Sequence, residues 1–119
     1  IGNNRFILDA YNANPSSMRV ALDNFGKLEA SHKMVFMGDM LELGAYSEQE
    51  HRDILLLALQ CNIDQIITIG PQFKALAQPS VHAFDNSADA HAWFIAQNVQ
   101  GATILLKGSR GMQLEKIIQ

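Results

Sequence analysis

Three short polar clusters contain the side chains of this chain that are best suited to bind a charged ligand. Their members are Asp9, Tyr11, Asn12 and Asn14 in the first cluster, Asp39 and Glu42 in the second, and Lys107, Ser109 and Arg110 in the third. Each cluster leads into an expected helix, and a helix N-terminus favours anions because its first N–H groups are unpaired and its dipole is positive there. The three clusters are therefore the candidate binding site.

Most of these residues also have an ordinary structural alternative. The alternatives are a helix cap for Asn14, core packing for Tyr11, a solvated turn for Asp39 and Glu42, and a solvated surface for Lys107 and Arg110. Gly108 and Gly111 favour a ligand more strongly, because glycine near a strand end usually marks a positive φ or a close approach of the backbone. His51 lies inside an expected helix, where a packed or surface histidine is commoner than a ligand.

The sequence lacks the motifs that mark a complete active site. It contains no G-x-G-x-x-G dinucleotide fingerprint, no G-x-x-x-x-G-K-[ST] phosphate loop and no G-x-S-x-G nucleophile elbow. The remaining histidines are scattered and indicate no metal site. We therefore assign no catalytic residue and no metal ligand to this chain, and we interpret the clusters as part of a larger active site.

The elements that must position these clusters alternate along the chain. Five short apolar runs predict strands at Arg5–Asp9, Lys33–Met37, Gln65–Ile69, Val81–Phe84 and Ala102–Leu106. Each run is short and most end at Gly, Pro or Asp, which is typical of strands that are buried on both faces of a parallel sheet.

Helical patterns with start signals lie between the strands. Asn14-Pro15 predicts a capped helix start, and Ser47–Glu50 has the pattern of a capping box for a helix to about Gln60. Pro71 begins a short helix. Asn86 or Ser87 is expected to cap the next helix, and Ser109 the last. Strands that alternate with helices indicate an α/β fold with a mostly parallel sheet of about five to six strands. In such sheets ligands bind at the carboxyl ends of the strands, where the three clusters fall.

Composition limits the classes of protein to which the chain can belong. Its 119 residues correspond to one domain, with 48% hydrophobic and 18% charged residues and a net charge of −3. The absence of a basic cluster argues against nucleic acid, and the apolar run Ile54–Leu59 is too short to cross a membrane. Cys61 is the single cysteine, so no internal disulfide can form. We expect a soluble domain of a reducing compartment.

Three ordered segments of the chain resemble one protein family. Asp9–Met18 (DAYNANPSSM), Val35–Gly44 (VFMGDMLELG) and Leu106–Met112 (LKGSRGM) are similar to three motifs in the C-terminal domain of the Mur ligases that add D-alanyl-D-alanine. Ser47 and His51 follow the second segment, and Leu114-Glu115 follow the third, as in the family. The resemblance extends over nearly the whole chain, residues 1–119.

The resemblance implies a Rossmann-like, three-layer domain of a bacterial cytoplasmic enzyme. The family consumes ATP with Mg²⁺ to convert UDP-N-acetylmuramoyl-tripeptide to an acyl phosphate, which the amine of D-alanyl-D-alanine then attacks to form a peptide bond of the peptidoglycan precursor. The N-terminal and central domains of the family hold the UDP-sugar, the phosphate loop and the magnesium ligands. This chain resembles the third domain alone, so we expect no tightly bound cofactor and no activity from it in isolation.

The resemblance also implies two sets of binding residues. Asp9, Tyr11, Asn12 and Asn14 are expected to face the nucleotide. Asp39, Glu42, Lys107, Ser109 and Arg110 are expected to bind substrate, because the carboxylates can accept from the amine of D-alanyl-D-alanine and the Arg110 fork can bind its terminal carboxylate. In the assembled enzyme a closing domain of this kind orients the amine and excludes water from the acyl phosphate.

Two other readings remain open from the residues. A phosphorylation-dependent receiver domain has a similar length, an acidic residue after its first strand and a lysine after its fifth, which Asp9 and Lys107 match. A receiver also needs a phosphoacceptor Asp after the third strand, where this chain has Gly70-Pro71, and an acidic pair after the first, where Ala10 follows Asp9. The third reading is a nucleotide- or ligand-binding α/β module without ligase activity.

Overall fold

The fold is built on a parallel sheet of five strands. The computed structural model describes residues 3–9, 13–76 and 78–118. The strands are β1 (Arg5–Asp9), β2 (Lys33–Gly38), β3 (Gln65–Ile69), β4 (Val81–Phe84) and β5 (Thr103–Lys107). They lie in the order β1-β5-β2-β3-β4, and every neighbouring pair is parallel. The predicted α/β fold with a mostly parallel sheet is confirmed.

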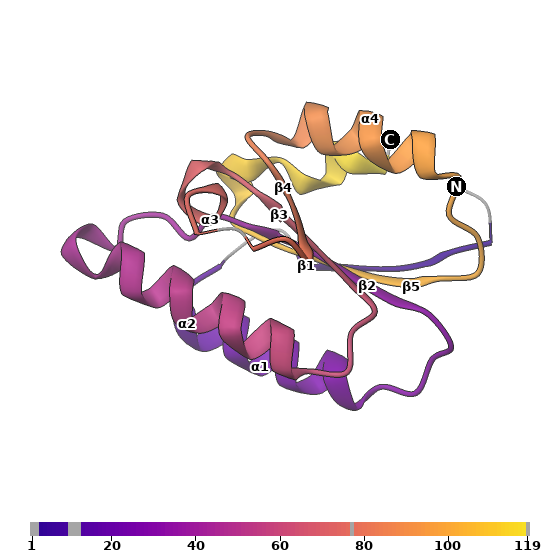
Figure 1. The fold of residues 1–119 in the computed structure, drawn as a ribbon, viewed down its shortest axis with the longest axis horizontal. Helices are drawn as coiled ribbons and strands as arrows, with labels where there is room; N and C mark the ends of the chain where they lie inside the picture. Colours follow the sequence, from indigo (N-terminus) through magenta and orange to yellow (C-terminus); the bar gives the residue numbers. More distant parts are fainter. Residues whose placement is uncertain (1–2, 10–12, 77, 119) are drawn as a thin grey trace.

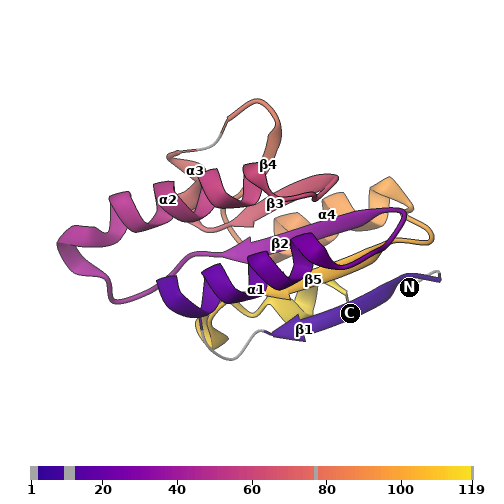
Figure 2. The same cartoon turned by 90° about the horizontal axis from the view of Figure 1, so that it is seen from below.

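Helices cover both faces of the sheet. Figure 1 shows α1 (Pro15–Lys27) and α2 (Ser47–Gln60) on one face, and α4 (Ser87–Gln97) with the C-terminal segment on the other. The short α3 (Pro71–Lys74) packs against α2. Figure 2 shows α1 and α2 in front of the sheet, with β1 at its lower edge. None of the helices among the described residues is both long and apolar enough to cross a membrane.

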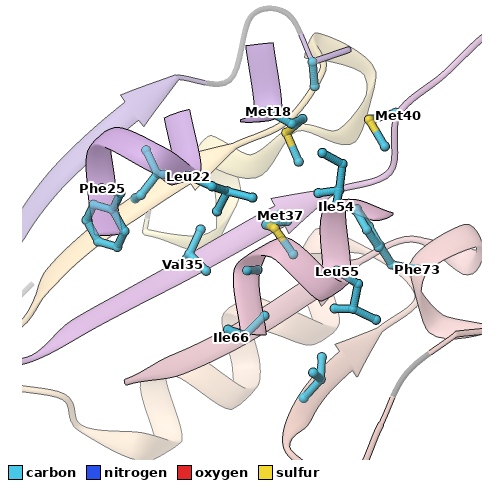
Figure 3. Packing of buried hydrophobic residues seen from close by; sticks show 14 residues of the cluster. Met18, Leu22, Phe25, Val35, Met37, Met40, Ile54, Leu55, Ile66 and Phe73 are labelled. Carbon is cyan, nitrogen blue, oxygen red and sulfur yellow. The ribbon is translucent and has the colours of Figure 1, made fainter. Parts of the chain in front are cut away.

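Two hydrophobic cores result, one on each face. Figure 3 shows the core under α1 and α2, where Met18, Leu22 and Phe25 of α1 meet Val35 and Met37 of β2. The opposite core is formed by alternate residues of the same strands with α4 and the C-terminal segment: Met34, Phe36, Ile67, Ile69, Ala90, Phe94, Ile104, Leu106, Leu114 and Ile117. Side chains of successive strand residues point to opposite faces, so a continuous apolar run supplies both cores.

Edge strand β1 departs from the expectation that all strands are buried on both faces. All residues of the central strands β2 and β5 are buried, whereas Leu8 in β1 is 54% exposed. The reason is topological, because β1 has β5 on one side and no strand on the other within the described chain. Its apolar character alone could not reveal which edge it occupies.

The predicted helix starts at asparagines are confirmed. The Asn14 Oδ1 accepts from the Ser17 N–H at 2.9 Å, and the Ser17 hydroxyl accepts from the Asn14 N–H at 3.1 Å, which closes a reciprocal cap on α1. The Asn86 Oδ1 accepts from the Asp89 N–H at 2.9 Å and caps α4. Each cap satisfies backbone N–H groups that the helix itself leaves unpaired.

The helix predicted from Ser47 to about Gln60 is confirmed as α2, but the capping box predicted for it and the helix predicted after Ser109 are wrong. Ser47 is the first residue of α2 and not its cap, because the 3₁₀ helix Gly44–Tyr46 runs directly into α2 and no side chain caps that start. After Ser109 the chain forms the 3₁₀ helices Arg110–Met112 and Leu114–Ile117 in place of the expected α-helix. Gln113 lies between them with φ 53°, a left-handed conformation that interrupts a continuous helix.

Candidate functional site

The strand order brings the described residues of the three polar clusters together at the carboxyl ends of neighbouring strands. Because β5 lies between β1 and β2, the third cluster lies between the first and the second. Asp9 and Lys107 are register partners at the ends of β1 and β5, and the Lys107 Nζ donates to the Asp9 Oδ2 at 3.0 Å. The sequence could not predict this neighbourhood, since it does not reveal strand order.

An open hollow lies beside this ion pair. Its volume is about 540 Å³, and it is lined by Asp9, Asn14, Ser16, Ser17, Val20, Ala21, Asn24 and Lys107. The side chain of Asp9 is 50% exposed here, whereas that of Lys107 is 3% exposed. The hollow therefore offers a carboxylate to a ligand, with a buried cation held behind it.

A smaller apolar hollow adjoins the first along the same helix. It has a volume of about 280 Å³ and shares Asp9, Ala21 and Asn24 with the larger one. Ile7, Phe25, Leu28 and Leu105 complete its lining. Together the two hollows form a groove between β1 and α1 that is polar at the carboxyl end of the strand and apolar further along, which we name the β1–α1 groove.

The nucleotide-side prediction can be compared with the structure only in part. Asp9 and Asn14 both line the larger hollow of the β1–α1 groove. Lys107 lines it too, although the resemblance placed this residue with the substrate set. Tyr11 and Asn12 lie outside the described residues. The described part of the first cluster thus gathers at one hollow and gains a cation from the third cluster.

Asp39 is buried at the carboxyl end of β2, with 2% of its surface exposed. Its Oδ2 accepts from the Gln72 N–H at 2.7 Å and its Oδ1 from the Phe73 N–H at 2.9 Å, so both oxygens are bound to the start of α3. Burial raises the pKa of this carboxyl above its ordinary value of 3.8, and the two backbone donors of Phe73 and Gln72 offset the rise in part. Both carboxylate oxygens of Asp39 are therefore used to hold the start of α3 against β2.

Gly70 makes that contact possible. It lies just before α3 with φ 121°, a conformation that essentially only glycine adopts. A Cβ at this position would overlap the carboxylate of Asp39. The Gly70-Pro71 pair that ends β3 is thus required for the approach of Asp39 to the N–H groups of Gln72 and Phe73.

The loop between β2 and α2 carries the other acidic residue of the second cluster. Glu42 is exposed and has φ 64°, and Gly44 follows with φ 59°. Two left-handed residues within three positions turn the chain sharply before the 3₁₀ helix Gly44–Tyr46. Glu42 is consequently the accessible carboxylate of its cluster.

The third cluster lies against the second. A Cβ on Gly38 would be 3.5 Å from the Cα of Gly108, and one on Gly108 would be 2.7 Å from Cδ1 of Leu114. Gly108 therefore permits close packing within the protein, where the sequence analysis favoured a ligand. A Cβ on Gly111 would lie 3.5 Å from Cδ1 of Leu41, which places the second and third clusters side by side.

Two members of the third cluster lie at the start of the first C-terminal 3₁₀ helix. Arg110 is exposed at the first residue of this helix. Ser109 immediately precedes it, and its Oγ is buried without a hydrogen-bond partner among the described residues. An unpaired buried hydroxyl is unfavourable, so Ser109 is the member of this cluster best placed to gain from an incoming polar group.

No metal site is evident in the described part of the chain, where no three His, Cys, Asp or Glu side chains gather in a way that could hold an ion. The arrangement can do different chemistry. The β1–α1 groove offers a carboxylate and amides suited to hydroxyl and amino groups. The second and third clusters add two exposed residues of opposite charge, Glu42 and Arg110.

Two buried polar residues, His51 and Lys33, were not assigned a contact from the sequence. His51 is fully buried, and it shares the inward face of α2 with Ile54, Leu55 and Ala58. That spacing was a usable signal, because positions separated by three, four and seven residues lie on one face of a helix. The packed alternative for His51 is confirmed over the surface one.

Lys33 is the second of these residues and is 1% exposed at the start of β2. Its Nζ donates to the carbonyl oxygens of Phe25, Gly26 and Leu28 at 3.1, 3.0 and 2.8 Å. It therefore caps the C-terminal end of α1, where a cation is favoured by the helix dipole. A lysine that opens an apolar run gives no sign of such a role in the sequence.

Comparison with known proteins gives a consistent set of relatives. A UDP-N-acetylmuramoyl-tripeptide–D-alanyl-D-alanine ligase of Bacillus subtilis is 34% identical over 95% of this chain. A crystal structure of MurF from Acinetobacter baumannii superposes with a TM-score of 0.81 at 34% identity over 95% of the chain. A MurF ligase from Thermotoga maritima, crystallised with ADP, superposes with a TM-score of 0.78 at 17% identity over 99% of the chain, and so supports the fold alone.

The chain spans about a quarter of the length of these relatives: 27% of the Bacillus subtilis protein and 26% and 28% of the two structures. The sequence profile of the family described as "Mur ligase, glutamate ligase domain" matches residues 1–110. This match includes the first two polar clusters and extends through Arg110 of the third. The chain therefore belongs to the Mur ligase family, as its glutamate ligase domain.

Proposed function

We propose that this chain is the C-terminal domain of an ATP-dependent ligase that joins D-alanyl-D-alanine to UDP-N-acetylmuramoyl-tripeptide. The observation that carries the proposal is the family match together with relatives of that name along 95% of the chain. The three clusters that resemble the family's motifs lie on adjacent strands in the structure, as one continuous site requires. We assign the ligase to peptidoglycan precursor synthesis in the bacterial cytoplasm, in keeping with an unpaired Cys61.

The β1–α1 groove is the proposed nucleotide side. Asp9 is exposed enough to accept from ribose hydroxyls, and the neighbouring Lys107 keeps a positive charge behind it. Asn14 is already committed to the α1 cap through its Oδ1, so its remaining amide donors are the groups available to the nucleotide. Tyr11 and Asn12 stay assigned to this side by resemblance.

The second and third clusters are the proposed D-alanyl-D-alanine side. The exposed Arg110 binds the terminal carboxylate, the exposed Glu42 accepts from the ammonium group, and the Ser109 hydroxyl gains a partner. Asp39 contributes by fixing α3 against β2, because both of its oxygens are bound to backbone. These residues hold and orient the ammonium group, which loses a proton to solvent to become the nucleophilic amine. The amine nitrogen then forms a C–N bond at the acyl carbon, the C–O bond to the phosphate breaks, and inorganic phosphate leaves as the nitrogen loses a second proton.

Phosphate transfer itself depends on groups outside this chain. Phosphoryl transfer requires positioned phosphate-binding groups and Mg²⁺, and the described residues hold no cluster of metal ligands. We therefore assign the phosphate loop and the magnesium ligands to the central domain of the full-length protein, and the UDP-sugar site to its N-terminal domain. Closure of this domain over the nucleotide would orient the amine and exclude water.

The test is steady-state assay of the full-length protein. ADP release is expected to require both the UDP-muramoyl-tripeptide and D-alanyl-D-alanine, and the 119-residue chain alone is expected to unfold cooperatively but release no phosphate. Arg110→Ala should raise the KM for D-alanyl-D-alanine at least about tenfold, equivalent to about 1.4 kcal/mol.

Lys116→Ala is the matched control, since Lys116 is an exposed cation on the next 3₁₀ helix. It should leave that KM unchanged. Full-length protein that releases ADP without D-alanyl-D-alanine dependence would overturn the proposed function, and an Arg110→Ala effect no larger than that of Lys116→Ala would overturn the role of Arg110.

A further inference from the structure

A single buried imidazole joins the two ends of the loop that carries Glu42. The Nε2 of His51 lies 2.9 Å from the Met40 N–H, at the beginning of this loop. The Nδ1 of the same ring lies 2.7 Å from the Ser47 carbonyl oxygen, at its end. The span from residue 40 to residue 47 is therefore fixed by one side chain on α2.

The two partners determine the protonation of the ring. A backbone N–H only donates, so Nε2 must accept, and a carbonyl oxygen only accepts, so Nδ1 must carry the proton. The ring is therefore the neutral Nδ1–H tautomer. The Ser47 hydroxyl lies 3.2 Å from Nδ1 and also donates to the Gln72 Oε1, which extends the connection to α3.

The surroundings of His51 hold it in place. Its ring is fully buried and packs edge-on against Phe73 at a centroid distance of 4.6 Å. The charged group that faces it is the Asp39 carboxylate, whose Oδ1 is 3.9 Å from Nε2. Figure 3 shows Met40 at one end of the core beneath α1 and α2, and its side chain is 1% exposed. The beginning of the loop is thus anchored both by packing and by His51.

Between these anchors most of the loop is exposed, although Leu43 is partly buried against the core beneath α1 and α2. Leu41 is 48% exposed, Tyr46 is 75% exposed, and Glu42 and Gly44 adopt left-handed conformations. Glu42 itself is exposed, so its position depends on where residues 40 and 47 are fixed and on the contact of Leu43 with the core. A residue that sets both anchor points sets the direction in which the Glu42 carboxylate points.

We propose that His51 is a positioning residue that fixes the loop of residues 40–47 and thereby sets the affinity for the amine-bearing substrate. This inference rests on the proposed function for the identity of that substrate. His51 does not touch the substrate, because it is fully buried beneath the loop. It acts through the Met40 N–H and the Ser47 carbonyl, whose separation determines how far Glu42 reaches toward the third cluster.

Two substitutions separate the two hydrogen bonds of the ring. The amide nitrogen of His51→Asn can replace Nδ1 at the Ser47 carbonyl, but this side chain is too short to reach Met40. The amide oxygen of His51→Gln can reach the position of Nε2 and accept from the Met40 N–H. Both variants bury an uncharged amide of similar polarity, so each serves as the control for the other.

The experiment measures KM and kcat of both variants in the full-length protein. His51→Asn is expected to raise the KM for D-alanyl-D-alanine at least about fivefold, with the KM for ATP changed less than twofold, and His51→Gln to restore most of the loss. A purely structural role predicts that both KM values and kcat change together in both variants. Equal effects of Asn and Gln on the KM for D-alanyl-D-alanine would therefore overturn the proposal.

Hydrogen exchange of the wild-type full-length protein tests the anchor without any variant. The Met40 amide is expected to be strongly protected, whereas the Leu41 and Glu42 amides exchange quickly. An unprotected Met40 amide would overturn the inference even if a variant fails to fold. Wild-type protein without ligase activity would instead overturn the proposed function and the substrate assigned here, while the exchange result would still decide whether His51 anchors the loop.

Discussion

Asp9 and Asp39 occupy comparable places in the sequence, since each stands at the carboxyl end of an apolar strand and each begins or continues a polar cluster. In the structure their surroundings differ. The Asp9 side chain is half exposed over the β1–α1 groove and pairs with Lys107. Asp39 is buried, with both oxygens bound to backbone N–H groups of α3. One carboxylate can meet a ligand, and the other holds the fold that presents the ligand site.

The place of each strand in the sheet explains the difference. β1 is at the edge, and Asp9 at its carboxyl end lines the groove beside α1. β2 is central and is flanked by β5 and β3, so the chain that leaves it meets α3, which follows β3. An acidic residue at a strand end is therefore a candidate for ligand binding only where no helix start lies within reach of its oxygens.

The largest expected effect is that of Gly70→Ala on the free energy of unfolding, because this substitution disturbs the buried carboxylate of Asp39. The substitution forces an alanine to φ 121° and places its Cβ on the Asp39 carboxylate. Backbone strain of about 1–3 kcal/mol and loss of the α3 hydrogen bonds together predict a destabilisation of about 3 kcal/mol or more. Urea unfolding of the 119-residue chain measures it.

Gly101→Ala is the matched control for that experiment. Gly101 also has a positive φ, 70°, but a Cβ there would meet no atom within 4 Å. We expect a loss of about 1–2 kcal/mol from the left-handed backbone alone. Similar losses at the two glycines would show that contact with Asp39 contributes nothing, and the buried carboxylate would then lose its structural role.

The next-largest effects on stability are expected from replacing Asp by Asn at position 39 and at position 9. Asp39→Asn replaces one accepting oxygen by a donor that faces a backbone N–H, which predicts a loss of about 1–3 kcal/mol in the free energy of unfolding. Asp9→Asn removes one half-exposed ion pair, for which we expect about 1 kcal/mol or less.

In the full-length protein the order should reverse for nucleotide binding. Asp9→Asn should raise the KM for ATP more than Asp39→Asn, because only Asp9 lines the β1–α1 groove. Steady-state kinetics at a temperature where both variants are folded gives the comparison. A larger ATP effect from Asp39→Asn would contradict the assignment of the two strand ends.

Strand bounds and asparagine caps were predictable because they depend on local sequence. The runs at Arg5–Asp9, Gln65–Ile69 and Val81–Phe84 match β1, β3 and β4 residue for residue, and Asn14 and Asn86 cap as expected. These features need only an apolar run with a stop signal, or an amide that can reach an N–H three residues on.

Features that depend on distant neighbours were not predictable. Ser47 has the spacing of a capping box, but the 3₁₀ helix before it continues into α2 and turns its hydroxyl to His51 and Gln72. Lys107 was grouped with the substrate residues, and only the pairing of β1 with β5 places it beside Asp9. The fold class follows from alternation of elements, whereas the composition of the site follows from strand order.

The two asparagine caps give a third, smaller test. Asn14 caps α1 beside the β1–α1 groove, and Asn86 caps α4 on the opposite face of the sheet. Asn14→Ala and Asn86→Ala should each lower the free energy of unfolding by about 1 kcal/mol. Only Asn14→Ala should raise the KM for ATP in the full-length protein. An equal change in that KM from Asn86→Ala would show that the loss of a cap, and not a contact with the nucleotide, is responsible.

The smallest expected effect is the pH dependence that Asp39 contributes to stability. Burial raises the pKa of this carboxyl in the folded state above 3.8, its ordinary value, and the N–H groups of Phe73 and Gln72 cancel part of the rise. A raised pKa means that the folded state binds this proton more tightly than the unfolded state does. The stability that the proton provides is therefore fully present below about pH 3.8 and is lost as the pH rises through the folded-state pKa.

Urea unfolding of the wild type and of Asp39→Asn across this acid range isolates the contribution of Asp39, because the other titrating groups are common to both proteins. The free energy of unfolding of the wild type, relative to that of Asp39→Asn, should fall as the pH rises through the folded-state pKa and then remain constant toward neutrality. The opposite slope would mean that the hydrogen bonds from α3 outweigh the burial of the carboxylate. Asp39 would then favour its charged form in the folded state, and burial would not be the dominant influence on this carboxyl.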